Sequence, residues 1–228
     1  MSISFDLAVK EKLNKSIQEV IQETWEYIYH HKFMDEKSLQ NAITNTLLSI
    51  LYERSSETEE HSRRIENYCN SIGRKLQLSS KEMNELSLLT LLHDIGKVCI
   101  NPNILKKPGP LTSTEWEEMK YHTESGCRIT QVIPELSKVA DLILSHHEHW
   151  DGNGYPRGLK GEEIPLPCRI LAVIDAFDAM TNDRVYRKAM IREEAILEIE
   201  RNSGTQFDPE ITSLFIKTIM DENDNSGK

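Results

Sequence analysis

Apolar residues recur at steps of three and four along most of the chain, and this periodicity restricts the fold more than any other feature. Between residues 80 and 94, for example, Met83, Leu86, Leu89 and Leu92 would share one face of a helix. No convincing alternation of apolar and polar residues indicates a series of strands, and no internal repeat is visible. The sequence therefore predicts an all-α protein.

Local signals place the ends of several predicted helices. Ser79 and Glu82 have the spacing of a capping box, a second box begins at Thr112, and Asp208 with Pro209 is typical of a helix start. The predicted helices cover residues 1–33, 39–51, 65–76, 80–94, 113–122, 135–149, 169–183, 192–202 and 209–219.

Two segments rich in proline or glycine are expected to interrupt these helices, at residues 101–110 and 151–167. The second contains four of the ten glycines and three of the eight prolines, so its backbone is tightly specified. A loop of this length is usually functional.

The charge balance excludes some classes of partner. The chain has 27 Lys and Arg against 37 Asp and Glu, a formal charge of -10, which disfavours binding to DNA, RNA or an anionic membrane surface. A small anionic substrate is not excluded.

Four cysteines without a CxxC pair, and no apolar signal peptide, predict a cytoplasmic protein with reduced thiols. No apolar stretch approaches the roughly 20 residues of a membrane helix, so no membrane insertion is expected.

Six of the eight histidines lie between positions 61 and 149, and several of them adjoin apolar segments. His93 and Asp94 end a strongly apolar helix, His146 and His147 follow another apolar run, and Asp175 lies inside a third. A buried carboxylate without a partner is costly, and adjacent buried imidazoles need metal or proton partners. These side chains are therefore candidates for a metal site.

Each candidate also has a simpler interpretation when taken alone. Glu57 and His61, four residues apart, could be a surface pair, His122 could face solvent, and His93 could interact with a helix dipole. Five predicted helices each offer such a group, so the joint probability of these simpler interpretations is low. Eight nitrogen and oxygen ligands exceed the needs of one ion and suit two or three divalent metals about 3.5 to 4 Å apart. The eight candidates are Glu57, His61, His93, Asp94, His122, His146, His147 and Asp175.

Two runs of residues resemble a known family. His93-Asp94-Ile95-Gly96-Lys97 is similar to the HD motif of the HD phosphohydrolase superfamily, and residues 146–156 (HHEHWDGNGYP) resemble the signature of its HD-GYP branch. The resemblance extends over about residues 40 to 215 and includes residues 104–109, 164–165, 175–181 and 183–187. It implies an HD-domain helical bundle with additional C-terminal helices and an N-terminal helical extension.

The resemblance implies hydrolysis of cyclic di-GMP, a bacterial second messenger, to linear pGpG and in part to GMP. It makes all eight candidates metal ligands, with Asp94 the bridge, and Glu57 favours capacity for a third ion. Iron or manganese is expected ahead of zinc, nickel, cobalt and magnesium. Glu59 stands where the family often has glycine, but this departure removes no ligand.

Substrate contacts are also implied by the resemblance. Lys97 matches a lysine that contacts the scissile phosphate, and with Asp94 it is an expected catalytic residue. Arg184 and Arg187 match positions that bind the ligand. Taken alone, the two arginines could simply belong to a solvent-exposed face of the protein. The resemblance also implies that Asp178 lies near guanine and that Tyr155 forms part of the pocket wall. The segment that contains Tyr155 could instead be a turn anchored by the aromatic ring, or a surface for partner proteins.

Three domain segments are expected: an N-terminal helical extension or linker at 1–38, an HD-GYP catalytic domain at 39–220, and a disordered polar tail at 221–228. The first is predicted to form a homodimer through Leu13, Ile17, Val20 and Trp25. Family members also point to a diguanylate cyclase (GGDEF) partner.

Two further functions stay open. The enzyme could prefer another substrate, such as cyclic GMP-AMP or a nucleotide monoester, or the domain could be a cyclic di-GMP sensor or scaffold with little turnover. His30, His31 and His149 are expected to be polar histidines that bind no metal.

Overall fold

A computed structural model describes residues 39–55, 57–183 and 188–226, with backbone only for residues 222–226. The predicted helix at 1–33, its dimer contacts, and Arg184 and Arg187 lie outside the described residues. The chain divides into two compact units, Met1–Thr46 and Leu47–Lys228. Residues 39–46 of the first unit are helical, and the second unit begins with helical residues 47–54.

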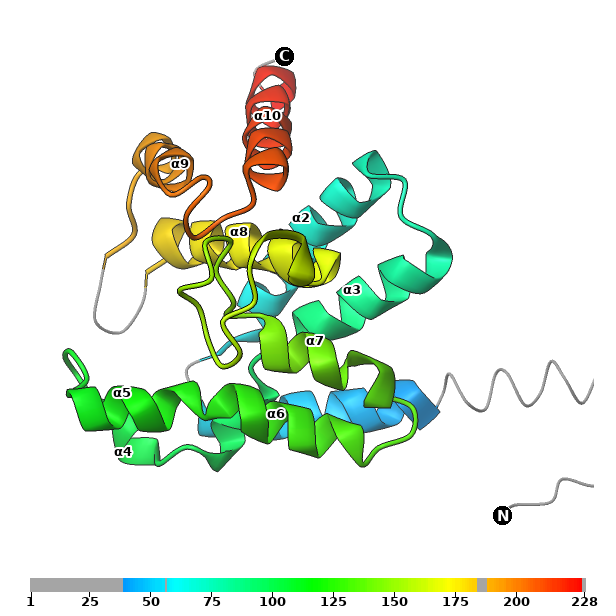
Figure 1. Ribbon diagram of the computed structural model, residues 1–228, viewed down its shortest axis with the longest axis vertical. Helices are drawn as coiled ribbons and strands as arrows, with labels where there is room; N and C mark the ends of the chain where they lie inside the picture. The colour runs from blue at the N-terminus through cyan, green and yellow to red at the C-terminus, as the bar shows by residue number, and fades with distance from the viewer. Residues whose placement is uncertain (1–38, 56, 184–187, 227–228) are drawn as a thin grey trace, which may run out of the picture. The chain divides into compact units, whose positions relative to one another are not determined.

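The prediction of an all-α fold is confirmed (Figure 1). Within the described residues no strand is present, and the single isolated bridge joins Ser203 to Phe207. The helices of the second unit are α2 (Glu59–Lys75), α3 (Ser80–Leu92), η1 (Ile95–Cys99), α4 (Pro102–Leu105), α5 (Ser113–Lys120), α6 (His122–Gln131), η2 (Ser137–Val139), α7 (Ala140–Ser145), η3 (Gly161–Glu163), α8 (Leu166–Thr181), α9 (Arg192–Arg201) and α10 (Pro209–Ser226). None of the described helices combines the length and apolar character that crossing a bilayer requires.

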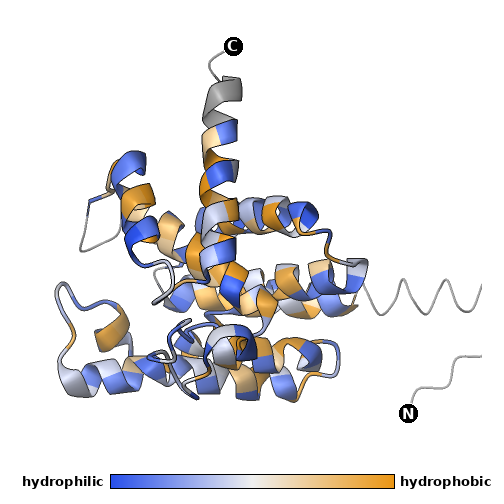
Figure 2. Cartoon of the chain, turned by 45° about the horizontal axis from the view of Figure 1, so that its top comes forward, coloured by the Kyte–Doolittle hydropathy of each residue, from blue (hydrophilic) through white to orange (hydrophobic). Residues whose placement is uncertain are grey.

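Helix α8 is the centre of the second unit. It packs against α2, α3, α7, α9 and α10, and Figure 1 shows it in yellow across the middle of the bundle. Its residues Ile170, Val173 and Ile174 are fully buried, and Phe177 stacks edge-on against Phe215 of α10 at 5.3 Å between ring centroids. Figure 2 shows hydrophobic and hydrophilic residues interleaved along the helices, as expected when each helix buries one face.

The predicted capping boxes are confirmed. Glu82 accepts a hydrogen bond from the Ser79 amide at 2.8 Å while the Ser79 hydroxyl accepts one from the Glu82 amide, and Thr112 caps α5 in the same way. The predicted start of the last helix is also confirmed, because Asp208 Oδ1 accepts from the Glu210 amide at 2.8 Å. These local bonds satisfy amides that a helix start would otherwise leave unpaired.

Two predicted helices differ in the structure, and both differences affect the site. The helix expected at 113–122 ends at Lys120, and His122 begins a separate helix, α6, that the sequence did not predict. The helix expected at 135–149 is replaced by a turn, η2 and a shorter α7 that ends at Ser145. The Ser145 hydroxyl accepts a hydrogen bond from Arg157 of the following loop, and the chain leaves the helix there. His146 and His147 therefore follow the helix end and do not lie on the helix.

Two smaller expectations are also corrected. The loop predicted at 101–110 contains the four-residue helix α4, whose first turn is capped by the Asn101 side chain. Helix α10 continues through residues 221–226, where disorder was predicted. The division into an extension at 1–38 and a catalytic domain at 39–220 stays a prediction.

Candidate metal centre

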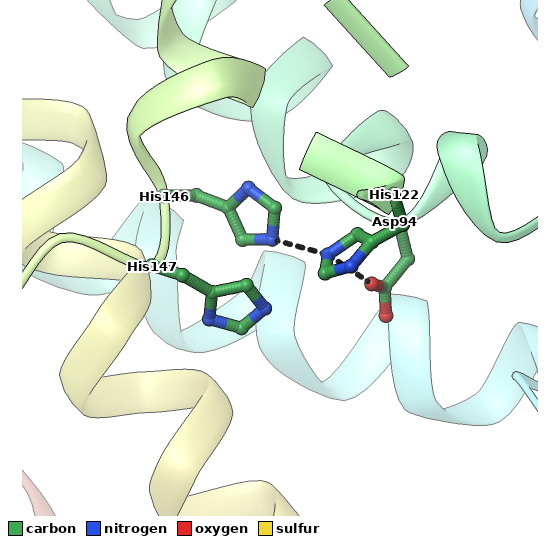
Figure 3. Close-up of side chains that lie close together, drawn as sticks. All are labelled: Asp94, His122, His146 and His147. Atoms are coloured by element: carbon green, nitrogen blue, oxygen red, sulfur yellow. Dashed lines mark hydrogen bonds and ion pairs between the residues drawn. The ribbon is translucent and has the colours of Figure 1, made fainter. Parts of the chain in front are cut away.

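Seven of the eight predicted ligands form two groups of nitrogen and oxygen atoms, in which all residues but His147 and Asp175 are buried. In each group the ligand atoms all lie within 4.8 Å of one another. His93 Nε2 lies 3.3 Å from Asp94 Oδ2 and connects the groups. The first group is Asp94, His122, His146 and His147 (Figure 3), and the second is His61, His93 and Asp175.

Glu57, the eighth predicted ligand, adjoins the second group. Its Oε2 lies 3.2 Å from His61 Nε2, one helical turn away, as the spacing predicted. The structure thus brings all eight predicted ligands into one region, from the start of α2 and the residues before it, the end of α3, the start of α6, the turn after α7, and α8.

Local backbone geometry orients three of the imidazoles. In each, Nδ1 lies within hydrogen-bond distance of the backbone carbonyl three residues earlier, so the ring nitrogen that faces the cluster is Nε2. A carbonyl can only accept, which places the proton on Nδ1 and leaves the Nε2 lone pair for a metal. These pairs are His93 with Thr90 at 3.0 Å, His122 with Met119 at 2.8 Å, and His146 with Ile143 at 2.6 Å.

The first group is packed so closely that its histidines disfavour protonation. His122 Nε2 lies 3.3 Å from His146 Nε2 and 3.5 Å from Asp94 Oδ1, as the dashed lines in Figure 3 mark. Burial, followed by the neighbouring imidazoles, lowers the pKa of His146 and His147 well below the usual range. Burial also lowers the pKa of His122. Neutral imidazoles are the form that binds metal ions.

His93 has the opposite balance. Burial alone would lower its pKa, but the charge and hydrogen bonding of Asp94, together with the charges of Asp175 and Glu57, outweigh burial and raise the pKa to about 9. Asp94 therefore stabilises positive charge at His93 Nε2, whether a proton or a metal ion carries that charge.

Several buried polar atoms in the cluster make no hydrogen bond within the described structure: His61 Nε2, His93 Nε2 and Asp94 Oδ1. Leaving such an atom unsatisfied costs about 1 to 3 kcal/mol. All three atoms face the ligand cluster, and a donor set of imidazoles and carboxylates without thiolate suits divalent ions such as iron, manganese or zinc. The residues therefore fit a site for divalent metals.

Lys97 lies between two of the carboxylates. Its Nζ donates to Glu57 Oε1 at 2.6 Å and to Asp94 Oδ2 at 2.7 Å. Burial would lower its pKa, but the two carboxylates outweigh burial and raise it. Lys97 is thus a fixed positive charge at the mouth of the cluster.

A cavity of about 620 Å³ opens beside the cluster. Glu57, Asp94, His147 and Asp175 line its polar side together with Lys97. The rest of the lining is largely apolar and includes Ile104, Leu105, Pro110, Leu111, Trp116, Met119 and Tyr155, and Lys107 also contributes to it.

Tyr155 joins the two sides of this cavity. Its ring lies 5.0 Å from the ring of His147 and 6.3 Å, edge-on, from Trp116. Burial raises the pKa of the Tyr155 hydroxyl, so it stays protonated at neutral pH. The expected place of Tyr155 in the pocket wall agrees with this geometry.

Asp178, which the resemblance places near guanine, is not among the residues that line this cavity. Its side chain is 2% exposed, it does not line the cavity, and its oxygens bond to His61 and Arg64 behind the cluster. A carboxylate whose oxygens are occupied in this way is not available to a guanine base. The signal that sequence reasoning missed is Arg64, three residues after His61 on the same helix face.

Glu148, a buried carboxylate in the HHEHW run, has a structural role that the sequence did not predict. Its oxygens accept hydrogen bonds from the backbone amides of Arg157 at 2.7 Å and Leu159 at 3.0 Å. Glu148 therefore ties the loop that carries Tyr155 to the turn that carries His146 and His147. A glutamate within an otherwise metal-binding run was the only sequence signal of this role.

Gly96 has a clear steric reason to be glycine. A Cβ atom there would lie 1.9 Å from the carbonyl oxygen of His122 and 2.5 Å from the amide nitrogen of Gly126. The absence of a side chain lets η1 approach α6 closely, and this contact brings Asp94 next to His122.

Comparison with known proteins identifies the family. Residues 45–211 match the model of the family described as "HD domain". The chain belongs to the HD domain family. This match spans both ligand groups, the cavity and α8.

Named relatives within this family include a cyclic di-GMP phosphodiesterase of Thermotoga maritima, 44% identical over 174 residues, which are 75% of this chain and 47% of the relative. A 3'3'-cGAMP-specific phosphodiesterase 2 of Vibrio cholerae is 34% identical over 186 residues, 81% of this chain and 36% of the relative. A solved cyclic GMP-AMP specific phosphodiesterase of V. cholerae superposes with a TM-score of 0.58 at 26% identity, over 83% of this chain and 50% of that one. The chain spans half or less of the length of these relatives.

Proposed function

We propose that this chain is a metal-dependent phosphodiesterase that hydrolyses cyclic di-GMP to pGpG and in part to GMP. The observation that carries the proposal is the buried set of eight nitrogen and oxygen ligands beside a cavity of about 620 Å³. Cavities of this size accommodate small-molecule ligands. Several relatives are named as phosphodiesterases of cyclic dinucleotides, which supports the same substrate class.

The two sides of the cavity fit the two parts of such a substrate. The phosphodiester would lie against the ligand cluster and the Lys97 ammonium, whose charge stabilises the negative charge that develops on phosphate. The purine bases would lie against the apolar wall that contains Trp116 and Tyr155. When bound, divalent metals lower the pKa of water to give a nucleophile and polarise the phosphoryl oxygens.

We propose two or three metal ions, with iron or manganese preferred, held by the eight predicted ligands. The two ligand groups support at least two positions, and Glu57 beside His61 supports a third. Asp94 is the proposed bridge, because Oδ1 lies 3.5 Å from His122 Nε2 while Oδ2 lies 3.3 Å from His93 Nε2.

The decisive experiment measures product from the metal-loaded protein. Protein purified without air and loaded with Mn²⁺ or Fe²⁺ is expected to convert cyclic di-GMP to pGpG, measured by liquid chromatography. The double variant His93→Ala/Asp94→Ala is expected to give no product. His149→Gln is the matched control, since His149 belongs to neither ligand group, and it should keep its activity. Absence of product from fully metallated wild-type protein would reject the proposal.

Cyclic GMP-AMP is the second candidate substrate, because two of the similar proteins are named for it. A competition assay with both dinucleotides, compared by kcat/KM, separates the candidates. The apolar wall of the cavity accepts either purine pair, so the preference depends on polar contacts to the bases.

Other parts of the interpretation stay predictions. They are substrate contacts by Arg184 and Arg187, a homodimer through the N-terminal helix, a diguanylate cyclase partner, and a cytoplasmic location. Light scattering over a range of concentrations tests the homodimer.

A further inference from the structure

A buried ion pair lies directly behind the ligand cluster. Asp178, on α8, is 2% exposed. Its Oδ1 accepts from Arg64 Nε at 2.6 Å, and its Oδ2 accepts from the terminal nitrogen of the same guanidinium at 2.9 Å. The Asn182 amide adds a third hydrogen bond, to Oδ1 at 3.1 Å. The carboxylate is therefore held on both oxygens.

The same carboxylate contacts a predicted metal ligand. Asp178 Oδ2 lies 2.7 Å from His61 Nδ1, and an ionised carboxylate can only accept, so this contact places a proton on Nδ1. The other ring nitrogen, Nε2, then has its lone pair free. It lies 3.2 Å from Glu57 Oε2 and 3.6 Å from Asp175 Oδ1, and makes no hydrogen bond.

His61 is thereby held differently from three other histidines of the cluster. His93, His122 and His146 are oriented by the backbone carbonyls three residues earlier in the chain, which the local helical backbone fixes. His61 depends on a carboxylate from another helix, 117 residues away in the sequence. That carboxylate must itself be fixed, and the two-point contact with Arg64 fixes both its position and its plane.

We propose that Arg64 and Asp178 are a positioning pair that fixes His61 Nε2 toward Glu57 and Asp175. The pair thereby sets the metal affinity of the position that these three ligands share. This inference rests on the proposed metal-dependent function, and it assigns Asp178 to metal binding instead of guanine recognition. A carboxylate behind a metal-binding histidine fixes the ring and makes it a better ligand, and its loss typically weakens metal binding about 10- to 100-fold.

The test compares Arg64→Gln and Asp178→Asn with Arg63→Gln, an exposed arginine on the same helix that serves as the matched control. Mn²⁺ binding is titrated by calorimetry and the bound metal is counted by mass spectrometry after gel filtration. In Arg64→Gln and Asp178→Asn, we expect Mn²⁺ to bind about 10- to 100-fold more weakly at the position shared by His61, Glu57 and Asp175. In Arg63→Gln the Mn²⁺ affinity should be unchanged. At saturating Mn²⁺, the KM for cyclic di-GMP should change less than about twofold.

Arg64→Lys keeps the charge but loses the two-point contact, so we expect metal affinity between that of wild type and Arg64→Gln. If Asp178→Asn fails to fold, the two Arg64 variants decide, because the Arg64 side chain is 38% exposed and its replacement is tolerated more easily. Unchanged metal affinity together with a raised KM for cyclic di-GMP would overturn the inference and indicate that Asp178 contacts the substrate. Because metal binding is measured without substrate, a wild-type protein that binds metal but forms no product would reject only the proposed function.

Discussion

At the scale of single residues, protons and metal ions compete for the same atoms in the ligand cluster. His122, His146 and His147 have pKa values lowered by burial, so the folded protein resists their protonation. His93 has its pKa raised to about 9 by Asp94 in spite of burial. The two shifts have opposite effects on stability as the pH changes.

The sign of each effect follows from proton linkage. Below the usual histidine pKa of about 6.5, His122, His146 and His147 bind protons in the unfolded chain but stay unprotonated in the folded protein. Acid therefore lowers the free energy of unfolding. The bound proton on His93 stabilises the fold fully below about 6.5, and this contribution is lost as the pH rises through about 9. Metal-free protein should therefore be most stable near neutral pH.

We predict that metal-free protein loses stability on both sides of neutrality, by up to about 1.4 kcal/mol per pH unit for each histidine that titrates. Urea unfolding in EDTA between pH 5 and pH 9.5 measures this profile. Asp94→Asn should reduce the loss on the alkaline side, because it removes the largest of the charges that raise the His93 pKa. A flat profile for the wild type would contradict the assignment.

The sequence indicated the candidate ligands more readily than the residues that contact them. His93, Asp94, His146 and His147 stand in short motifs, so local reading finds them. Arg64 and Asp178 are separated by 114 residues, and nothing local indicates that they meet. Resemblance placed Asp178 at the substrate, but three-dimensional packing places it behind His61.

At the scale of elements, the helix starts that carry a capping signal were predictable, and other helix ends were less so. Capping boxes are local, and those at Ser79 and Thr112 formed as expected. The end of α7 depends on the distant Arg157, which donates to Ser145, so periodicity alone extended that helix through His149. Helix α6 was not predicted, and the expected helix at 113–122 ends earlier, at Lys120.

The loop after α7 supports a prediction about Glu148. Replacing this residue by Gln puts an amide N–H₂ where a backbone amide of Arg157 or Leu159 now donates, so one of the two hydrogen bonds is lost. We expect the free energy of unfolding to fall by about 1 to 3 kcal/mol. Hydrogen exchange at the amides of residues 157–159 should become faster.

The matched control is Glu162→Gln, because Glu162 is exposed on the same loop. It should leave both quantities unchanged. If Glu148→Gln keeps slow exchange at Arg157 and Leu159, Glu148 does not hold the loop. Activity is a second readout, since Tyr155, in the cavity wall, belongs to this loop.

At the scale of the whole molecule, the ligand cluster connects helices that are distant in the sequence. Its ligands come from the start of α2, the end of α3, the start of α6, the turn after α7, and α8. Metal ions that bind only the folded chain stabilise it by about 2.7 kcal/mol per site at 100 times the dissociation constant. Metal binding should therefore stabilise all these helices against unfolding at the same time.

We predict that Mn²⁺ raises the thermal unfolding temperature of the wild type above its value in EDTA, and that His93→Ala/Asp94→Ala abolishes the increase. His149→Gln should keep it, which separates the cluster from general binding of cations to a chain of net charge -10. Hydrogen exchange adds a spatial test: slower exchange should appear in α2, α3, α6 and α8 on metal addition. Protection confined to one helix would mean that the ions bind outside the cluster, because ligands from five elements cannot be occupied without restraining each of them.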